Sequence, residues 1–295
     1  MKDKKVVFMG TPKFSLNVLE SLIENCNVIG VVTQPDKEVG RKKVLTMSPV
    51  KELALKHNIK VLQPKKLKNE YQDIIDLNPD VIITCAYGQI LPYELLSYPK
   101  YKTINVHASL LPKLRGGAPI QRAIMDGYKK TGVTIMRTEV GMDDGDMISF
   151  YEIEIKDDDT YETLSSKLSI VGKELLIKTL PSIFDGTCKY IKQNEDEVTF
   201  AKIIKKEDEY LSFDDTTINI YNKIRALSPE PCCYFNLNNE RVKIYNAKIG
   251  NFKASSYGKI TNISKEGLGI STNDGEIIIT KLQFPGKKVM EFKDY

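Results

Sequence analysis

The sequence is poor in the residue types that mark metal centres and disulfide frameworks. It has no tryptophan, only two histidines (His57 and His107) and five cysteines at irregular spacings. An odd number of scattered cysteines favours neither a disulfide framework nor a cysteine zinc site, so we expect small buried apolar side chains. Two histidines cannot supply a histidine-rich metal centre. We therefore expect no bound metal, and any imidazole chemistry has two candidates.

Long apolar runs and export signals are absent as well. No stretch of about eighteen apolar residues occurs, which argues against a membrane-spanning helix. The first residues read MKDKKVVFMG, and Thr11, Pro12 and Lys13 then interrupt the apolar run that a secretory signal requires. We expect a cytoplasmic protein with no membrane partner.

A dinucleotide fingerprint is also missing. The first apolar run, residues 5–10, leads into GTPKF, where a Rossmann fingerprint would need GxGxxG. This difference disfavours a nicotinamide-dependent dehydrogenase.

The composition that is present fits a globular protein of two domains. The chain has 295 residues, which is long for a single core. Its net charge of +4 is only mildly basic and does not by itself indicate nucleic acid. A local basic cluster does occur, at Arg41, Lys42 and Lys43.

Apolar runs alternate with helical patterns in the first part of the chain. This alternation predicts an α/β fold with a doubly wound, mostly parallel, Rossmann-like sheet. The predicted strands are residues 5–10, 28–33, 60–62, 81–85, 103–107, 133–137 and 147–155, and residues 34–49 are expected to form a polar loop. Ligands of such sheets bind outside the carboxyl ends of the strands.

The pattern of apolar and polar residues changes after an amphipathic helix predicted over residues 160–184. Short alternating runs at 242–245, 259–263, 268–271 and 277–282 are separated by turn residues, which indicates a small antiparallel, OB-like β-barrel. We predict a first domain over residues 1–190, a linker over 191–206 and the barrel over 207–295.

One strand carries a candidate catalytic pair. Residues two apart on a strand project to the same side, so Asn105 and His107 would present an amide and an imidazole together. The segment GMDDGDM could bring a carboxylate of Asp143, Asp144 or Asp146 to the imidazole. Such a set suits transfer of an acyl group to an amine, because a histidine can manage the amine proton and an amide can donate to the oxyanion. On spacing alone, however, an Asn-x-His pair is more often an accident, and aspartates around glycine are more often a turn.

Two long segments decide between these readings. NVHASLLPKLRGGAPIQRAI, followed by GVTIMRTEVGMDDGDMI, resembles the signatures of the folate-dependent formyltransferase family, and the resemblance covers nearly the whole chain. It implies transfer of a formyl group from 10-formyltetrahydrofolate to an amine. The family's catalytic trio falls on Asn105, His107 and Asp143, where Asp143 is chosen by the Asp-x-Gly spacing.

The resemblance also implies where the folate binds. The family loop SLLP corresponds to Ser109, Leu110, Leu111 and Pro112. The loop AYGQILP resembles the lining of the pterin pocket, which implies roles for Tyr87, Gly88, Gln89, Ile90 and Leu91. Arg115, Gly116 and Gly117 are expected to shape the entrance for the amine.

Within the family, the segment VVTQPDKEVGRKKVLTMSPVKELA resembles a loop found in members that act on tRNA. It implies contacts of Arg41, Lys42 and Lys43 with the acceptor-stem region, and a tRNA-binding barrel. AKIIKKEDEYLSF and LQFPGKKVM offer Lys205, Lys206, Lys287 and Lys288 as further contacts. The expected partner is initiator methionyl-tRNA, formylated for translation initiation by a monomer. Alternatives are the same chemistry on an amino sugar nucleotide, or a folate- or tRNA-binding protein without catalysis.

Overall fold

The computed structural model describes residues 1–40, 42–253 and 256–295, and these residues form two compact units. The first unit comprises Met1–Gly117, Thr131–Ile153 and Ser166–Ala201. The second comprises Ala118–Lys130, Glu154–Ser165 and Lys202–Tyr295, and so takes two short segments that lie between segments of the first unit in the sequence. The predicted domain boundaries at 190 and 207 stay a prediction.

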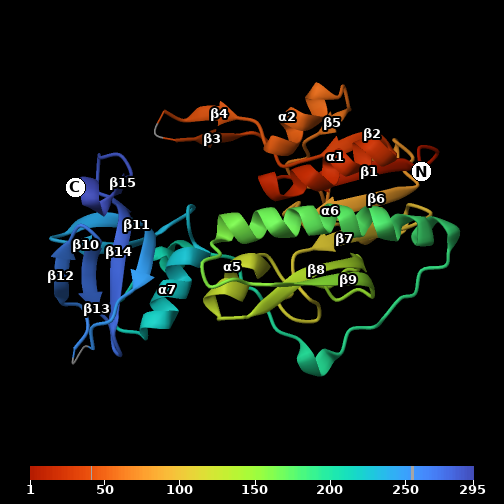
Figure 1. The fold of residues 1–295 in the computed structure, drawn as a ribbon. Coiled ribbons are helices and arrows are strands. Elements are labelled where there is room, and N and C mark those ends of the chain that lie inside the picture. Colours follow the sequence, from red (N-terminus) through yellow and green to blue (C-terminus); the bar gives the residue numbers. More distant parts are fainter. Residues whose placement is uncertain (41, 254–255) are drawn as a thin grey trace. The chain divides into compact units, whose positions relative to one another are not determined.

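A seven-stranded sheet, in the order β5-β2-β1-β6-β7-β8-β9, forms the centre of the first unit (Figure 1). Its strands are β1 (Lys5–Gly10), β2 (Asn27–Val32), β5 (Val61–Leu62), β6 (Val81–Cys85), β7 (Thr103–His107), β8 (Lys130–Arg137) and β9 (Met147–Glu154). The five strands from β5 to β7 are parallel, and β7 pairs antiparallel with β8. The predicted doubly wound, mostly parallel sheet is therefore confirmed.

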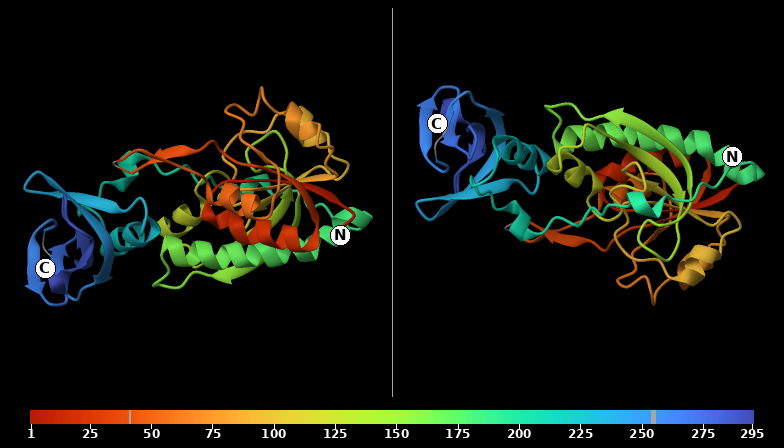
Figure 2. Two further views of the ribbon diagram at one scale, coloured as in Figure 1. Left: turned by 90° about the horizontal axis from the view of Figure 1, so that it is seen from above. Right: turned by 90° about the horizontal axis from the view of Figure 1, so that it is seen from below.

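Apolar side chains on both faces explain why these segments form inner strands. Every residue of β6 is buried, as is typical of parallel strands covered on both sides. Figure 2 shows α1 (Leu16–Asn25) and α6 (Tyr161–Asp185) on one face of the sheet. Ile74 of α3 (Gln72–Ile75) lies in one apolar cluster with Val7 and Met9 of β1. The remaining helices are α2 (Pro49–Lys56), α4 (Tyr93–Ser97), α5 (Pro119–Met125) and α7 (Thr217–Ala226), with 3-10 turns at Lys13–Ser15, Glu195–Glu197, Lys206–Glu209 and Phe292–Asp294.

The order of the strands places the ligand crevice. From β1 the chain proceeds to β2 and β5 on one side, and from β6 to β7 and β8 on the other. The carboxyl ends of β1 and β6 therefore flank the point where the winding reverses, which is the usual ligand position in such sheets. There the Thr11 hydroxyl donates to the Tyr87 carbonyl over 3.1 Å.

The predicted loop at residues 34–49 is partly wrong. Strands β3 (Lys37–Val39) and β4 (Val44–Thr46) form a two-stranded antiparallel hairpin, with Val39 opposite Val44. Each strand has only three residues, all of them exposed, so no alternation of apolar and polar residues reveals them.

An antiparallel sheet dominates the second unit, in the order β10-β11-β14-β13-β12, with β15 paired to β14. The strands are β10 (Cys233–Leu237), β11 (Glu240–Ile249), β12 (Ile260–Ser264), β13 (Gly267–Ser271), β14 (Glu276–Gln283) and β15 (Met290–Glu291). The antiparallel β class predicted for this region is confirmed, whereas β10, β15 and α7 were not predicted.

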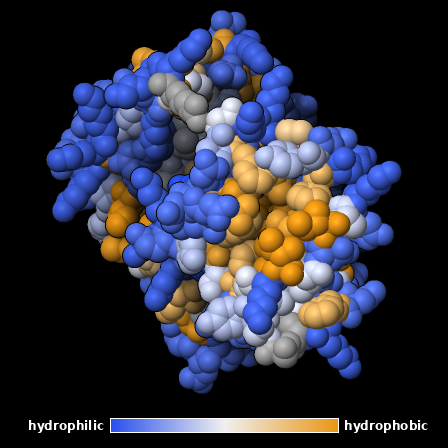
Figure 3. Space-filling view, turned by 90° about the vertical axis from the view of Figure 1, so that its left-hand side faces the viewer, coloured by the Kyte–Doolittle hydropathy of each residue, from blue (hydrophilic) through white to orange (hydrophobic). Residues whose placement is uncertain are grey.

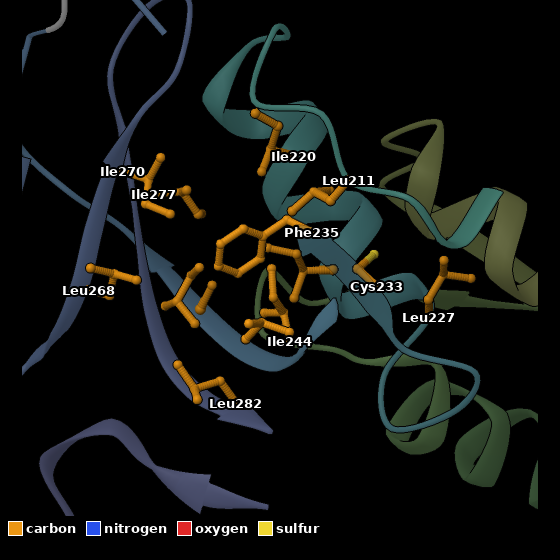
Figure 4. Close-up of a cluster of buried hydrophobic side chains, with 14 residues drawn as sticks. Leu211, Ile220, Leu227, Cys233, Phe235, Ile244, Leu268, Ile270, Ile277 and Leu282 are labelled. Carbon is orange, nitrogen blue, oxygen red and sulfur yellow. The ribbon is translucent and has the colours of Figure 1, made fainter. Parts of the chain in front are cut away.

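Alternation along these strands builds the core of the second unit. Figure 4 shows Phe235, Ile244, Ile270 and Leu282 pointing inward together with Ile220 of α7. Figure 3 shows an apolar area among hydrophilic side chains on one face of the molecule. No helix in the described part of the chain is long and apolar enough to span a membrane.

Candidate active site

Strand β7 delivers an amide and an imidazole to the carboxyl edge of the first sheet. Asn105 is half-buried and His107 is 5% exposed. The Thr84 hydroxyl on the neighbouring strand donates to Asn105 Oδ1 over 2.9 Å. This bond orients the amide, because it leaves Nδ2 as the group that faces Asp143, 3.5 Å away. The amide can therefore donate a hydrogen bond in the site.

The loop between β8 and β9 brings a carboxylate to this pair. Asp143 Oδ2 lies 3.6 Å from His107 Nδ1 and accepts a hydrogen bond from Gly116 N over 2.8 Å. Asp143 has φ of +50°, an uncommon conformation for a residue with a side chain. The structure thus brings together the three side chains that the family resemblance selected.

The neighbouring aspartates take other positions. Asp144 is exposed, and its carboxylate lies against Gly141, where an added Cβ would meet it. Asp146 accepts from Arg137 N through its backbone carbonyl. Asp143 is therefore the carboxylate of this loop that pairs with His107. The catalytic roles of the three residues stay a prediction.

The hydrogen bonds of His107 decide which ring nitrogen is available. Nε2 lies 3.0 Å from the carbonyl oxygen of Leu114. A carbonyl can only accept, so Nε2 carries a proton, and in the neutral ring Nδ1 is the free lone pair. This nitrogen is the one that lies 3.6 Å from the Asp143 carboxylate.

A returning segment, residues 190–201, is bound along the site. Leu114 N donates to Thr199 Oγ1 over 2.9 Å, and Arg115 pairs with Phe200 in a parallel bridge. At Gly116, with φ of +119°, an added Cβ would lie 2.8 Å from the Ala201 carbonyl, so only glycine fits there.

Two side chains of this segment were missed by the sequence analysis. Gln193 Nε2 donates to the carbonyls of Asp143 and Gly145, over 2.8 Å each. Glu195 accepts from the Arg115 guanidinium over 2.8 Å, and this hydrogen bond lowers the pKa of Glu195. Arg115 itself is 4% exposed, so it serves the interior of the unit rather than an open entrance. No motif marks Gln193 or Glu195, because their segment reads as a linker.

The candidate folate residues at 109–112 are mostly buried. Ser109, Leu111 and Pro112 are buried and Leu110 is half-buried. The Ser109 hydroxyl donates to Lys113 O over 2.6 Å, and the Thr134 hydroxyl donates to Ser109 O over 2.7 Å. The loop is thus shaped internally and leaves mainly its backbone and Leu110 for a ligand.

The second candidate folate loop is more open. Gly88 and Ile90 are exposed, with Ile90 at 84%, whereas Gln89 and Leu91 are half-buried. Tyr87 is buried, and burial raises the pKa of its phenol, which therefore stays protonated. Gln34 Nε2 donates to Tyr87 O over 3.1 Å and anchors the loop. An exposed glycine beside an exposed apolar side chain suits contact with a flat polar ring.

The candidate tRNA-binding lysines are on the surface. Lys42, Lys43, Lys205, Lys206, Lys287 and Lys288 are all exposed, whereas Arg41 lies outside the described residues. Lys42 and Lys43 lie between β3 and β4, and Lys43 is 3.9 Å from Glu38. These positions suit phosphate contacts, but the contacts themselves stay a prediction. In the described part of the chain, no group of His, Cys, Asp and Glu side chains is arranged to hold a metal ion.

Family models and curated relatives of the same kind match both parts of the chain. Residues 4–180 match the family model described as formyl transferase, and residues 203–295 match the formyl transferase C-terminal domain. The methionyl-tRNA formyltransferase of Bacillus subtilis (strain 168) is 48% identical over 99% of this chain and 93% of its own length. That of Bacillus thuringiensis subsp. konkukian is 50% identical over 99% of this chain and 94% of its own length.

Solved structures share the fold. An N-formyltransferase from Helicobacter canadensis, in complex with folinic acid and dTDP-3-aminofucose, matches with a TM-score of 0.68 and 24% identity over 94% of this chain and 98% of its own. Methionyl-tRNA formyltransferase from Clostridium thermocellum matches with a TM-score of 0.60 and 19% identity over 85% of this chain and 95% of its own.

Proposed function

The chain belongs to the formyl transferase family, and from this premise we propose that it formylates the amino group of initiator methionyl-tRNA. The formyl donor is 10-formyltetrahydrofolate, and the product is N-formylmethionyl-tRNA for translation initiation. Identity of 48% across 99% of the chain to an enzyme named for this reaction supports the choice of acceptor. The convergence of Asn105, His107 and Asp143 carries the proposal for catalysis.

The first residue role is stabilisation of charge. As the amine nitrogen attacks the formyl carbon, the formyl oxygen gains negative charge. Asn105 Nδ2, oriented by the Thr84 hydroxyl, donates a hydrogen bond to that oxygen. A donor fixed before the reaction loses little energy to reorganisation, which is why such groups are effective.

The second role is management of the amine proton. His107 Nδ1 accepts the proton that the amine loses, directly or through one water, while Nε2 keeps its bond to Leu114 O. Asp143 stabilises the charged ring and holds its orientation. The bond between the formyl carbon and the folate nitrogen then breaks, and this nitrogen takes the proton that His107 received, directly or through one water, as it leaves.

The two candidate folate loops would hold the donor. Backbone groups from Gly88 to Leu91 would meet the pterin ring, because the Tyr87 carbonyl already accepts from Thr11 and Gln34. Tyr87, Gln89, Ile90 and the loop from Ser109 to Pro112 would complete the pocket. The reaction needs no metal.

The exposed lysines would hold the tRNA. Lys42 and Lys43 of the hairpin, together with Arg41, would meet phosphates near the acceptor end. Lys205, Lys206, Lys287 and Lys288 of the second unit would meet phosphates elsewhere on the tRNA. We propose that the enzyme acts as a monomer in the cytoplasm.

The proposal is tested by formyl transfer from 10-formyltetrahydrofolate to methionyl-tRNA, free methionine and an amino sugar nucleotide, measured side by side. Transfer to methionyl-tRNA alone, weakening steeply as salt rises, is the expected result. Transfer to the sugar alone would overturn the acceptor while leaving the trio and the folate site. Absence of transfer to any acceptor would overturn the catalytic roles as well.

A further inference from the structure

The backbone of the turn that carries Asp143 is bound by one buried side-chain amide, that of Gln193. Gln193 is 9% exposed, and its Nε2 donates to the carbonyls of Asp143 and Gly145, over 2.8 Å each. Two carbonyls two residues apart converge on one NH2 group, so both are satisfied only while the turn keeps its present shape. Both donor positions of the amide are thereby used.

A buried cation fixes which way this amide points. Arg115 Nε donates to Gln193 Oε1 over 2.9 Å. The guanidinium is held in turn by Glu195, over 2.8 Å and 3.3 Å. Since Arg115 can only donate, Gln193 must present its oxygen to Arg115 and its NH2 to the turn. The orientation of the amide therefore follows from the chemistry of its neighbours.

We propose that Gln193 is a positioning residue that holds the Asp143 carboxylate against His107. The inference rests on the proposed function, because it assigns a role within the same site. Gln193 touches neither the imidazole nor the reacting groups in this assignment. It acts through the backbone of Asp143, on which the 3.6 Å approach to His107 Nδ1 depends.

The local conformation explains why such support is needed. Asp143 has φ of +50°, which costs free energy and persists only where surrounding contacts impose it. Gly116 N holds the carboxylate at one end and Gln193 holds the backbone at the other. A displacement of about 1 Å in such a site can lower the rate on the order of 100-fold.

Gln193→Glu is the most direct test, because it keeps the shape and the acceptor for Arg115 while removing the donors to the turn. We expect kcat to fall roughly 10- to 100-fold, with KM for 10-formyltetrahydrofolate and methionyl-tRNA changed less than about threefold. Gln72→Glu is the matched control, since Gln72 is exposed on α3 and bonds Asp76. It adds the same charge and should leave kcat unchanged.

A double-mutant cycle separates positioning from general support of the fold. Asp143→Ala alone should lower kcat strongly, and adding Gln193→Glu to it should lower kcat by no more than about twofold further. If Gln193→Glu does not fold, Arg115→Lys takes its place, because it removes the Nε donor that orients the amide. Adding Arg115→Lys to Asp143→Ala should likewise lower kcat by no more than about twofold further. Thermal unfolding checks that each variant is folded.

Losses that multiply in the cycle, or an unchanged kcat for Gln193→Glu, would overturn the positioning role. The cycle is run with the amine that the wild-type chain formylates. If that amine is the sugar nucleotide rather than methionyl-tRNA, the proposed acceptor fails while the cycle still decides the role of Gln193.

Discussion

At the scale of single residues, hydrogen-bond direction decides what each catalytic candidate can do. The Thr84 hydroxyl turns the Asn105 amide, and the Leu114 carbonyl selects the free nitrogen of His107. Leu114 has φ of +60° and is bound to Thr199, so the returning segment helps to place this carbonyl. The residue types come from β7, but their chemical orientation comes from neighbours.

Asn105→Ala tests the oxyanion role. Loss of one preorganised donor typically lowers kcat by about 100- to 1000-fold, and we expect a loss of this order in formyl transfer to methionyl-tRNA. Asn273→Ala is the control, because Asn273 is an exposed asparagine of the second unit that bonds Asp214. Activity of Asn105→Ala close to that of the wild type would remove Asn105 from the mechanism.

The thiols offer a separate check on burial. Burial raises the pKa of Cys85 and Cys233 to about 12 and that of Cys232 to about 11, and it also raises the pKa of Cys26. A raised pKa keeps these thiols protonated at pH 8, where only a thiolate reacts readily. Cys188 is half-buried and is the most accessible of the five.

We therefore expect iodoacetamide at pH 8 to modify mainly Cys188 in the folded protein and all five thiols after unfolding. Peptide mass spectrometry locates the modified positions. Raising the pH toward 11 should speed labelling of Cys232 before that of Cys85, if the fold survives. Rapid labelling of Cys85 at pH 8 would contradict its burial.

At the scale of elements, the hairpin of β3 and β4 is built to present charge rather than to fill a core. All six strand residues are exposed, and the base is held by Lys51, which donates to Asp36 over 2.7 Å and to Gln63 over 2.8 Å. The bond from Lys51 lowers the pKa of Asp36, so this anchor remains charged at neutral pH. Because the base of the hairpin is anchored and its strands are exposed, the hairpin can contact a large anionic partner.

Neutralising the hairpin should weaken tRNA binding without changing the chemistry. Removing one lysine–phosphate interaction makes the slope of log affinity against log salt shallower by about 1, so Lys42→Ala with Lys43→Ala should make it shallower by about 2. KM for methionyl-tRNA should rise at about 150 mM salt, whereas KM for the folate should not change. For Lys42→Ala alone, Lys178→Ala on α6 is the charge-matched control, and an equal change of slope there would argue against a specific role for the hairpin.

At the scale of the whole molecule, two units carry separate cores. Ile277 and Ile279 of β14 are fully buried in the second unit, and the intervening Ile278 is only partly buried. This alternation is what allows one face of the sheet to build a core. The second unit also incorporates Arg225, whose guanidinium donates to the Lys156 and Asp159 carbonyls over 3.1 Å and 2.9 Å.

Ile279→Ala should destabilise the second unit by about 2–5 kcal/mol, because it removes buried methyl groups and leaves a cavity. Ile278→Ala, on the other face of the same strand, should cost less. Denaturant unfolding followed by circular dichroism measures both. Equal losses for the two variants would contradict the register of β14.

The sequence by itself determined the elements whose apolar patterns are long and regular. Residues 81–85 and 103–107 read as buried strands, the pattern at 160–184 as a helix, and the later alternation as antiparallel strands, all as observed. The two long motifs also sufficed to select the family. The three-residue strands and the helix Thr217–Ala226 were not predicted from the sequence. Such short or weakly patterned segments form through contacts with residues that are distant in sequence.

Only the tertiary structure decided which groups meet. Asp143 was selected by motif, but its approach to His107 depends on Gly116 N, and its backbone is bound by Gln193, fifty positions away in the chain. This glutamine lies in the segment that the sequence predicted to be a linker. Its hydrogen bonds to the turn join two parts of the chain that are distant in sequence. Composition and periodicity report which face of an element is buried. They carry no record of which polar side chain, from another part of the chain, satisfies a particular carbonyl.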